Sequence, residues 1–542
     1  MKQQPRELLE KAIQLNPELA DAYFKLGVLH KSENNSELAV EHFRKAVQIN
    51  EEFPEAECAL AIELANLDQL EESREHFLNA LEINPNFAKA YFHYGLLLIE
   101  VNDIEEAKNN FDKVTEIDQN YSPAYFYKAF LLKNADDFDE ACKNYETAID
   151  INPKFVECHY YYAKLLAGGI ATNNEGSIID KKNIPLATKH FEIVLELDSN
   201  HSKACYNLGK IHLDNGLIKE SQVFLERALE INSAYSKAQY LLGLIFEKTS
   251  KVDEHKLNLT QTSDKIKPAD SSSIQKALEH YSKAINHNPN HNLAYFRIGR
   301  LFFILNNNEK SHDHLSKAAL INNEHAETQF YLGMLSKNDK DATLAKKHFY
   351  KALELNPEFP EAYFELAVHS ESNGDISEAK IHFQKATEVD QNYAEAYFNL
   401  GRLCSTNPSE FEQAYRNFET ALEIDPEYEI CHYFFGKLLI NGSQVTKDGS
   451  LVQKPDLKQA ELHFMEALRI NPNSSISLFE LGKLQSSKKM FYEAYQSLAK
   501  AIKVDPKFAD AHYELAVLLM NKSAQNVISR KVSSLHKKKS KK

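Results

Sequence analysis

The chain lacks tryptophan and is poor in the residues that interrupt helices, since Gly and Pro number only 16 each among 542 residues. So few turn-forming residues favour long helices joined by short turns. Six cysteines in a chain of this length do not make a disulfide framework, and reduced thiols are expected. No run of about 18 apolar residues is present, which argues against a membrane span. The opening MKQQPRELLEKAIQLNPEL has no apolar stretch of the kind that a signal peptide needs.

Signatures of catalysis are also missing. The chain contains neither a GxGxxG motif nor a phosphate-binding Gly-Lys-Ser/Thr loop, and no CxxC pair has the spacing of a zinc site. His312 and His314 stand close together in SHDHL, and His287 precedes His291 by four residues. A metal role for these pairs competes with the simpler interpretation of solvated histidines near helix ends. No catalytic, metal or cofactor site is predicted, and the chain is expected not to be an enzyme.

Charge is unevenly distributed. The net charge is −15, but the segment from Lys522 to the end carries eight basic residues and no acidic one, so the body before it is at −23. An acidic body is not expected to bind nucleic acid along its length. Residues 522–542 are predicted to be a basic disordered tail that is either simply solvated or contacts nucleic acid, anionic lipid or an import receptor. The expected location is cytoplasmic, with nuclear import through the tail as the alternative.

A repeat dominates what is present. The phrases LNP and IDP return along the chain, and nine of the thirteen intervals between their Asn or Asp residues are 34 residues long, the others being 35, 46, 46 and 56. These residues are Asn16, Asn50, Asn84, Asp118, Asn152, Asp198, Asn232, Asn288, Asn322, Asn356, Asp390, Asp425, Asn471 and Asp505. The longer intervals indicate insertions into an otherwise regular array.

Small and large residues recur at fixed places in this period. One position is always Gly or Ala, as in Gly27, Ala61 and Gly95, and another is mostly Phe, as in Phe43 and Phe77. A large ring opposite a small residue lets two amphipathic helices approach closely. Each repeat is therefore predicted to hold a first helix, such as 20–33, and a second helix, such as 37–50, followed by a turn that often contains Pro.

This pattern resembles the tetratricopeptide repeat (TPR) family, through motifs such as AYFKLG, AYFNLG, EAKNNF and KALELNP. The resemblance covers residues 1 to about 521 and departs from the family in having Tyr where its Trp stands. It implies an all-α solenoid wound into a right-handed superhelix, with first helices along the concave side. About thirteen full helix pairs are expected in one continuous array, with a lone second helix at its start and a lone first helix at its end.

The array is itself duplicated. TEIDQNYSPAYF at 115–126 returns as TEVDQNYAEAYF at 387–398, and the order of intervals after Asn16 matches that after Asn288. Two copies are predicted, 16–287 and 288–521. The insertions IATNNEGSIID (170–180) and SQVTKDGSLVQ (443–453) occupy the same place in each copy, and both predict a short β-hairpin, either for partner contact or as edge decoration. Residues 249–274 are polar and Ser-rich and are predicted to be a disordered loop.

Two columns on the first helices are the candidate partner-binding groove. The first is almost entirely aromatic, and its rings either anchor a partner or pack between repeats. The second is partly basic, and its cations either bind acidic or C-terminal segments or neutralise neighbouring Glu residues. The candidate residues are Phe24, Phe92, Phe126, Tyr160, Lys164, Tyr206, Lys210, Phe296, Arg297, Arg300, Phe330, Phe364, Phe398, Arg402, Tyr433, Lys437, Phe479 and Lys483.

The predicted function is a non-enzymatic scaffold that binds proteins or peptide segments, acidic ones among them, in the concave groove of a TPR superhelix. The alternative is a targeting arm for a peptide-modifying enzyme, similar to the TPR arm of glycosyltransferases, whose catalytic part is absent from this chain. A catalytic domain of its own would need roughly 100 residues outside the repeats, and the sequence offers no such segment.

Overall fold

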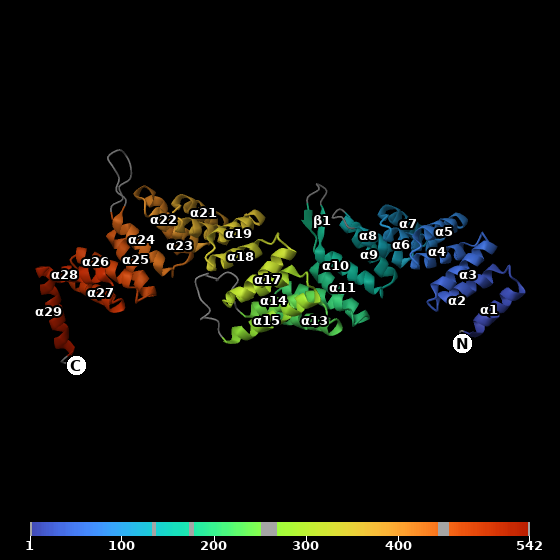
Figure 1. The fold of residues 1–542 in the computed structure, drawn as a ribbon, viewed down its shortest axis with the longest axis horizontal. Helices are drawn as coiled ribbons and strands as arrows, with labels where there is room; N and C mark the ends of the chain where they lie inside the picture. The colour runs from blue at the N-terminus through green and yellow to red at the C-terminus, as the bar shows by residue number, and fades with distance from the viewer. Residues whose placement is uncertain (1–2, 133–136, 173–177, 251–267, 443–454, 540–542) are drawn as a thin grey trace. The chain divides into compact units, whose positions relative to one another are not determined.

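The computed structural model describes residues 3–132, 137–172, 178–250, 268–442 and 455–539 (Figure 1). The described residues divide into two compact units, one ending at Asn288 and the other resuming at Pro289. Each unit is a series of helices that pack mainly against their neighbours in sequence. The tandem duplication remains a prediction from the sequence.

Unit 1 contains fifteen helices in its described residues. They are α1 (Gln3–Leu15), α2 (Ala20–Lys31), α3 (Ser36–Ile49), α4 (Pro54–Asn66), α5 (Leu70–Ile83), α6 (Ala88–Glu100), α7 (Ile104–Ile117), α8 (Ser122–Leu131), α9 (Phe138–Ile151), α10 (Val156–Gly168), α11 (Ile184–Leu197), α12 (Ser202–Asp214), α13 (Ile218–Ile231), α14 (Ser236–Thr249) and α15 (Pro268–His287).

Unit 2 contains fourteen α-helices in its described residues. They are α16 (Asn292–Ile304), α17 (Asn308–Ile321), α18 (Ala326–Asn338), α19 (Ala342–Leu355), α20 (Pro360–Ser372), α21 (Ile376–Val389), α22 (Ala394–Cys404), α23 (Phe411–Ile424), α24 (Glu429–Asn441), α25 (Leu457–Ile470), α26 (Ser475–Ser487), α27 (Phe491–Val504), α28 (Ala509–Met520) and α29 (Lys522–Lys539), with a short 3-10 turn at Pro408–Glu410.

The helices associate as the sequence predicts. After α1, which stands alone, thirteen first-and-second pairs run from α2/α3 to α26/α27 within the described ranges, and α28 follows as a first helix. The closest packing in the chain is within these pairs. The all-α helix-pair architecture is therefore confirmed, with the last helix as an addition.

That last helix corrects the prediction of a disordered tail at 522–542. Over Lys522–Lys539 the chain forms α29, which packs on α27 and α28. Ala524 and Ile528 are buried in the same apolar cluster as Leu498 and Leu518, and Lys531 Nζ lies 3.0 Å from Glu493 Oε1. Four residues separate Ala524 from Ile528, so one apolar stripe suffices to hold this basic helix against the last repeat.

Each pair is held by the predicted fit of a large residue against a small one. Phe43 and Phe111 are fully buried, and their rings lie against Gly27 and Gly95, where an added Cβ would come within 2.7 and 2.9 Å of ring carbons. Leu225, Leu315 and Leu498 take the place of Phe in three repeats and lie against Gly209, Gly299 and Gly482. The small residue is required because the two helices approach too closely for any side chain there.

The recurring Asn or Asp of the period has a physical role that the sequence did not reveal. In thirteen of the fourteen repeats its side-chain oxygen accepts a hydrogen bond from the backbone N–H two residues later, as in Asn50 to Glu52 at 3.1 Å and Asp118 to Asn120 at 2.9 Å. This bond closes an Asx turn at the end of each second helix. The residue is periodic because every repeat makes the same turn into the next.

The insertions are only partly within the described residues. In the first, β1 (Ile170–Thr172) pairs antiparallel with β2 (Ile178–Asp180), while 173–177 lie outside the description. The second predicted hairpin, 443–453, lies outside the described residues and stays a prediction. The predicted disordered loop, 249–274, needs correction at both ends, because Ser250 is buried and α15 already begins at Pro268, burying Ile274.

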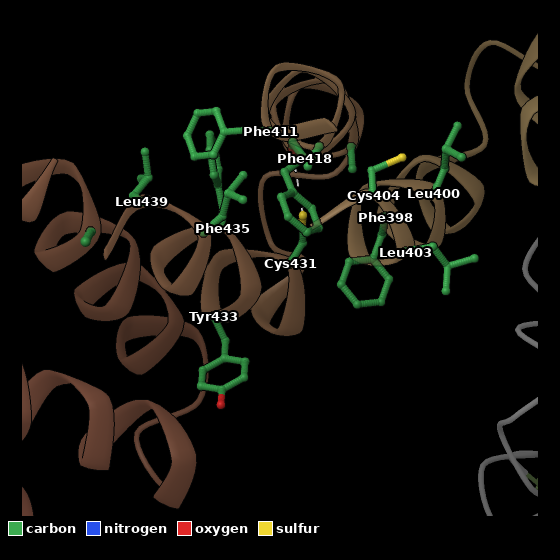
Figure 2. Close-up of a cluster of buried hydrophobic side chains, with 14 of the residues drawn as sticks. Phe398, Leu400, Leu403, Cys404, Phe411, Phe418, Cys431, Tyr433, Phe435 and Leu439 are labelled. Atoms are coloured by element: carbon green, nitrogen blue, oxygen red, sulfur yellow. Dashed lines mark hydrogen bonds between the residues drawn. The ribbon is translucent and has the colours of Figure 1, made fainter. Parts of the chain in front are cut away.

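The largest apolar cluster spans α20 to α26 in unit 2 (Figure 2). Phe418 of α23 lies in it, fully buried, with ring centroids 6.1 Å from Phe398 and 5.8 Å from Phe435. Gly401 of α22 faces the Phe418 ring. Elsewhere, no helix of the described ranges combines the length and apolar character that a membrane span requires.

A substitution at Gly401 tests this packing. A Cβ there would already lie 3.0 Å from two ring carbons of Phe418, so we expect Gly401→Val to lower the free energy of unfolding by about 1–3 kcal/mol through overpacking. The matched control is Gly401→Ala, because Ala367 stands at the equivalent position one repeat earlier. Urea unfolding of the two variants measures the difference, and equal stabilities would contradict the close approach.

Candidate partner-binding face

The aromatic column of the predicted groove lies between repeats. Each ring stacks on a residue at the start of the next first helix, with ring centroids 4.6–5.2 Å apart in ten repeats. The pairs are Phe24–Phe53, Phe92–Tyr121, Phe126–Phe155, Tyr160–His201, Tyr206–Tyr235, Phe296–His325, Phe330–Phe359, Phe364–Tyr393, Phe398–Tyr428 and Phe479–Phe508. Such offset pairs add stability beyond the area that they bury.

This packing removes most of the column from the accessible surface. Phe92, Phe126, Tyr160, Phe296, Phe330, Phe398, Tyr433 and Phe479 are buried, and Phe24, Tyr206 and Phe364 are half-buried. Burial raises the pKa of the Tyr160 hydroxyl, while a hydrogen bond from Asn207 opposes that shift. Of the two interpretations of this column, the structure gives the rings the packing role, so they cannot anchor a partner by insertion.

The two predicted arginines closest to the rings already have partners. Arg300 is buried, and its Nε donates to the Tyr331 hydroxyl at 3.1 Å. Arg402 Nη2 lies 2.7 Å from Glu371 Oε2 and donates to Asn399 Oδ1 at 3.1 Å. For Arg402 the neutralisation interpretation therefore holds, and for Arg300 the structure shows an internal hydrogen bond.

The lysines of the basic column behave differently. Lys164, Lys210 and Lys483 are exposed and Lys437 is half-buried, and within the described ranges only Lys483 has a carboxylate nearby, with Glu480 Oε2 at 3.6 Å. Several of these ammonium groups lie over the rings, since Lys164 is 5.9 Å from the Tyr160 centroid, Lys437 is 5.5 Å from Tyr433 and Lys483 is 5.1 Å from Phe479. Arg297 lies over Phe296 in the same manner, at 5.8 Å.

These residues define one face of each first helix. In α12, Lys203, Asn207 and Lys210 are spaced i, i+4 and i+7, so they lie on one side of the helix. The opposite side carries the buried Ala204, Leu208 and Ile211. We call the residues at these three spacings on the first helices the open face. It can present charge to another molecule without disturbing the packed core.

A second polar column joins the two helices of a pair, and it was missed in the sequence. A histidine stands immediately before the large residue of eight second helices, at His42, His76, His190, His280, His314, His348, His382 and His463. Five of them bond to the first helix, His190 to His159 at 2.8 Å, His463 to His432 at 2.9 Å, His280 to Gln239 at 2.7 Å, His348 to Gln329 at 2.9 Å and His76 to Glu57 at 2.5 Å. Its regular place in the period was the signal that could have revealed it.

The paired histidines are titratable groups with strongly shifted values. Burial lowers the pKa of His190 to about 4, with additional lowering from His159 and Lys189. Burial likewise lowers the pKa of His463 to about 4, with His432 adding to the shift and Glu466 opposing it. The two pairs stand 273 residues apart and make the same contacts, including a bond from the first-helix ring to a proline carbonyl, Pro153 or Pro426.

The histidines considered for a metal role take part in local structure. His291 Nδ1 accepts a hydrogen bond from the Ala294 N–H at the start of α16, and His314 Nδ1 donates to the Lys310 carbonyl at 2.8 Å. Among the described residues, no group of three or more His, Cys, Asp or Glu side chains is placed to hold a metal ion.

Comparison with sequence models of known families agrees with this geometry. Models described as tetratricopeptide repeat match residues 20–53, 76–109, 122–155, 202–235, 339–403 and 476–508, and a Sel1 repeat model matches 267–289. The matched segments follow the 34-residue period and begin at or near first helices. The chain is a tetratricopeptide repeat protein.

Solved structures with similar TPR folds include the yeast Tom70, with 15% identity, 95% of this chain and 99% of that chain covered, and a TM-score of 0.33. The TPR protein YrrB, whose structure is described as having an unusual peptide-binding site, has 23% identity, with 37% of this chain and 98% of that chain covered and a TM-score of 0.31. The Cut9–Hcn1 tetramer of the APC/C has 14% identity, with 96% and 94% covered and a TM-score of 0.33. No curated protein matches the chain in sequence.

Proposed function

We propose that this TPR protein is a non-enzymatic scaffold that binds segments of partner proteins along the open face of its first helices. The observation that carries the proposal is the recurring pair of a cation over a packed ring, formed by Lys164, Arg297, Lys437 and Lys483. The ring holds the cation in place, so its charge is ordered before a partner arrives. Ordered charged groups beside aromatic walls favour recognition of peptides.

The open face varies in charge from repeat to repeat while the packing beneath it stays constant. On α20 and α22 it is acidic, with Glu361, Glu365 and Glu395. Burial raises the pKa of the Glu395 carboxyl, and Asp425 and Glu365 raise it further. On α10 and α12 it is basic. Variable charge on a constant framework is what a surface needs in order to select among partners.

Site-specific photo-crosslinking tests the proposal. A photoreactive amino acid replaces Lys164 or Lys210 on the open face, and Lys143 or Lys219 on exposed parts of the second helices α9 and α13 as controls. We expect the open-face positions to crosslink the same partner polypeptides in cell extract, and the controls to give none of them. Equal crosslinking from both sets would contradict the proposal. The predicted alternative, a targeting arm for an enzyme on another chain, would show that enzyme or its substrates among the crosslinked proteins.

A further inference from the structure

Lysines gather on the open face of three successive first helices in unit 1. Lys164 lies on α10, Lys203 and Lys210 lie on α12, and Lys237 lies on α14, and all four are exposed. In the described part of the chain none of the four is in an ion pair, although most exposed lysines elsewhere in the array have a carboxylate partner within the same helix or the next repeat. The acidic groups nearest to them in sequence on this side are Glu157 and Asp214.

Contacts between the helices place these lysines on one surface. Asn207 Nδ2 lies 3.5 Å from the Tyr160 hydroxyl, which connects α12 to α10. Asn207 precedes Lys210 by three residues, and Tyr160 precedes Lys164 by four, so both lysines extend from the same side of the joined helices. Lys164 also lies 5.6 Å from the Tyr161 ring, which forms the wall beside it.

The equivalent surface of unit 2 provides an internal comparison. The positions 273 residues later keep two lysines, Lys437 and Lys483, but carry Ile476, Glu480 and Asp510 where unit 1 has Lys203, Asn207 and Lys237. Glu480 lies 3.6 Å from Lys483 and partly neutralises it. The framework is shared, and the unpaired positive charge is confined to the surface on α10, α12 and α14.

We propose that this surface, Lys164, Lys203, Lys210 and Lys237 with Tyr160 and Tyr161, binds an extended acidic segment of a partner protein. The inference rests on the proposed scaffold function and names the partner class for one part of the open face. Four ammonium groups without carboxylate partners are stabilised by an incoming anionic chain, which gains charge-assisted hydrogen bonds while the rings exclude water on one side. The face is built from successive helices, so it suits an extended chain better than a single carboxylate.

The test uses the full-length chain and fluorescence anisotropy with a labelled twelve-residue peptide of alternating Glu and Gly, beside a Gln–Gly peptide of the same length. We expect the acidic peptide to bind and the Gln–Gly peptide to bind at least tenfold more weakly, with an affinity for the acidic peptide that falls as salt rises. Equal binding of the two peptides, or no binding of either, would overturn the acidic class.

The decisive variant combines Lys203→Ile, Asn207→Glu and Lys237→Asp, which copies the residues that unit 2 carries at these positions. We expect it to bind the acidic peptide about tenfold or more weakly than the unchanged chain. The control, Lys143→Glu with Lys219→Glu, makes the same change in net charge on second helices and should change the affinity less than twofold. Lys164→Gln with Lys210→Gln, which alters only exposed side chains, serves as a second variant with the same expected loss.

Two further outcomes separate the hypotheses. If a labelled single-stranded oligonucleotide binds more tightly than the peptide and loses affinity in the same variants, the surface binds nucleic acid and the proposal is wrong. If photo-crosslinks from Lys164 and Lys210 capture partners but the acidic peptide does not bind, the scaffold function stands and this inference fails.

Discussion

Replacing Phe418 with alanine is expected to lower the free energy of unfolding of unit 2 by about 3–5 kcal/mol. The ring is fully buried between α22, α23 and α24, with Phe398 and Phe435 beside it and Gly401 facing it (Figure 2). Removing it deletes the buried ring and leaves a cavity that this helix pair cannot close, because the pair's neighbours hold both helices in position.

The matched control is Phe418→Leu. Leu225, Leu315 and Leu498 occupy the same position in three other repeats and are buried against glycine, so leucine suits this place in the period and should cost clearly less than alanine. Urea unfolding gives the two free energies, and hydrogen exchange locates the loss. Because each repeat contacts mainly its neighbours, we expect faster exchange in α22 to α25 and little change in unit 1. A loss below about 1 kcal/mol for alanine would show that the cluster is not close-packed.

Mild acid is expected to destabilise the folded chain through its paired histidines. His190 and His463 have a folded-state pKa of about 4, below the ordinary value of 6.5 that they regain on unfolding. Between those values the unfolded chain binds protons that the folded chain does not, so stability is complete above about pH 6.5 and falls as the pH drops toward 4. Both sites are partly open to solvent, so we expect about 2 kcal/mol in total at pH 5.

The variant His190→Asn with His463→Asn isolates this effect. Asn110, Asn144 and Asn417 occupy the same column in other repeats, so the substitution keeps a side chain that the helix pair already accommodates. Urea unfolding at pH 7.5 and pH 5.0 should show a smaller loss for the variant than for the unchanged chain. Staying at or above pH 5 keeps Glu378 and Glu466, whose pKa values are lowered by hydrogen bonds with Ser370 and Arg469, ionised throughout. An identical pH dependence in both proteins would show that these pairs are not the cause.

The repeat could be predicted because its contacts are local. The Gly or Ala of each first helix meets the Phe or Leu of its own second helix, as Gly95 meets Phe111 sixteen residues later, so the period and the helix pairs can be seen directly in the sequence. The open face could be predicted only in part. Lys164, Lys210, Lys437 and Lys483 do lie exposed or half-buried beside rings, because the i, i+4, i+7 spacing follows from helix geometry alone.

Tertiary structure decided the rest. Whether Phe398 faces a partner or packs depends on Tyr428 at the start of the next repeat, and whether Arg402 is free depends on Glu371 in the repeat before, so neither outcome belongs to one helix. The basic tail looked unstructured by composition, yet Ala524 and Ile528 find a surface on the last repeat and order it as α29. Sequence alone determined which helices form and how they pair, because those forces act within one repeat. Only the stacking of repeats decided which side chains remain available, because exposure is settled by neighbours that the local pattern does not name.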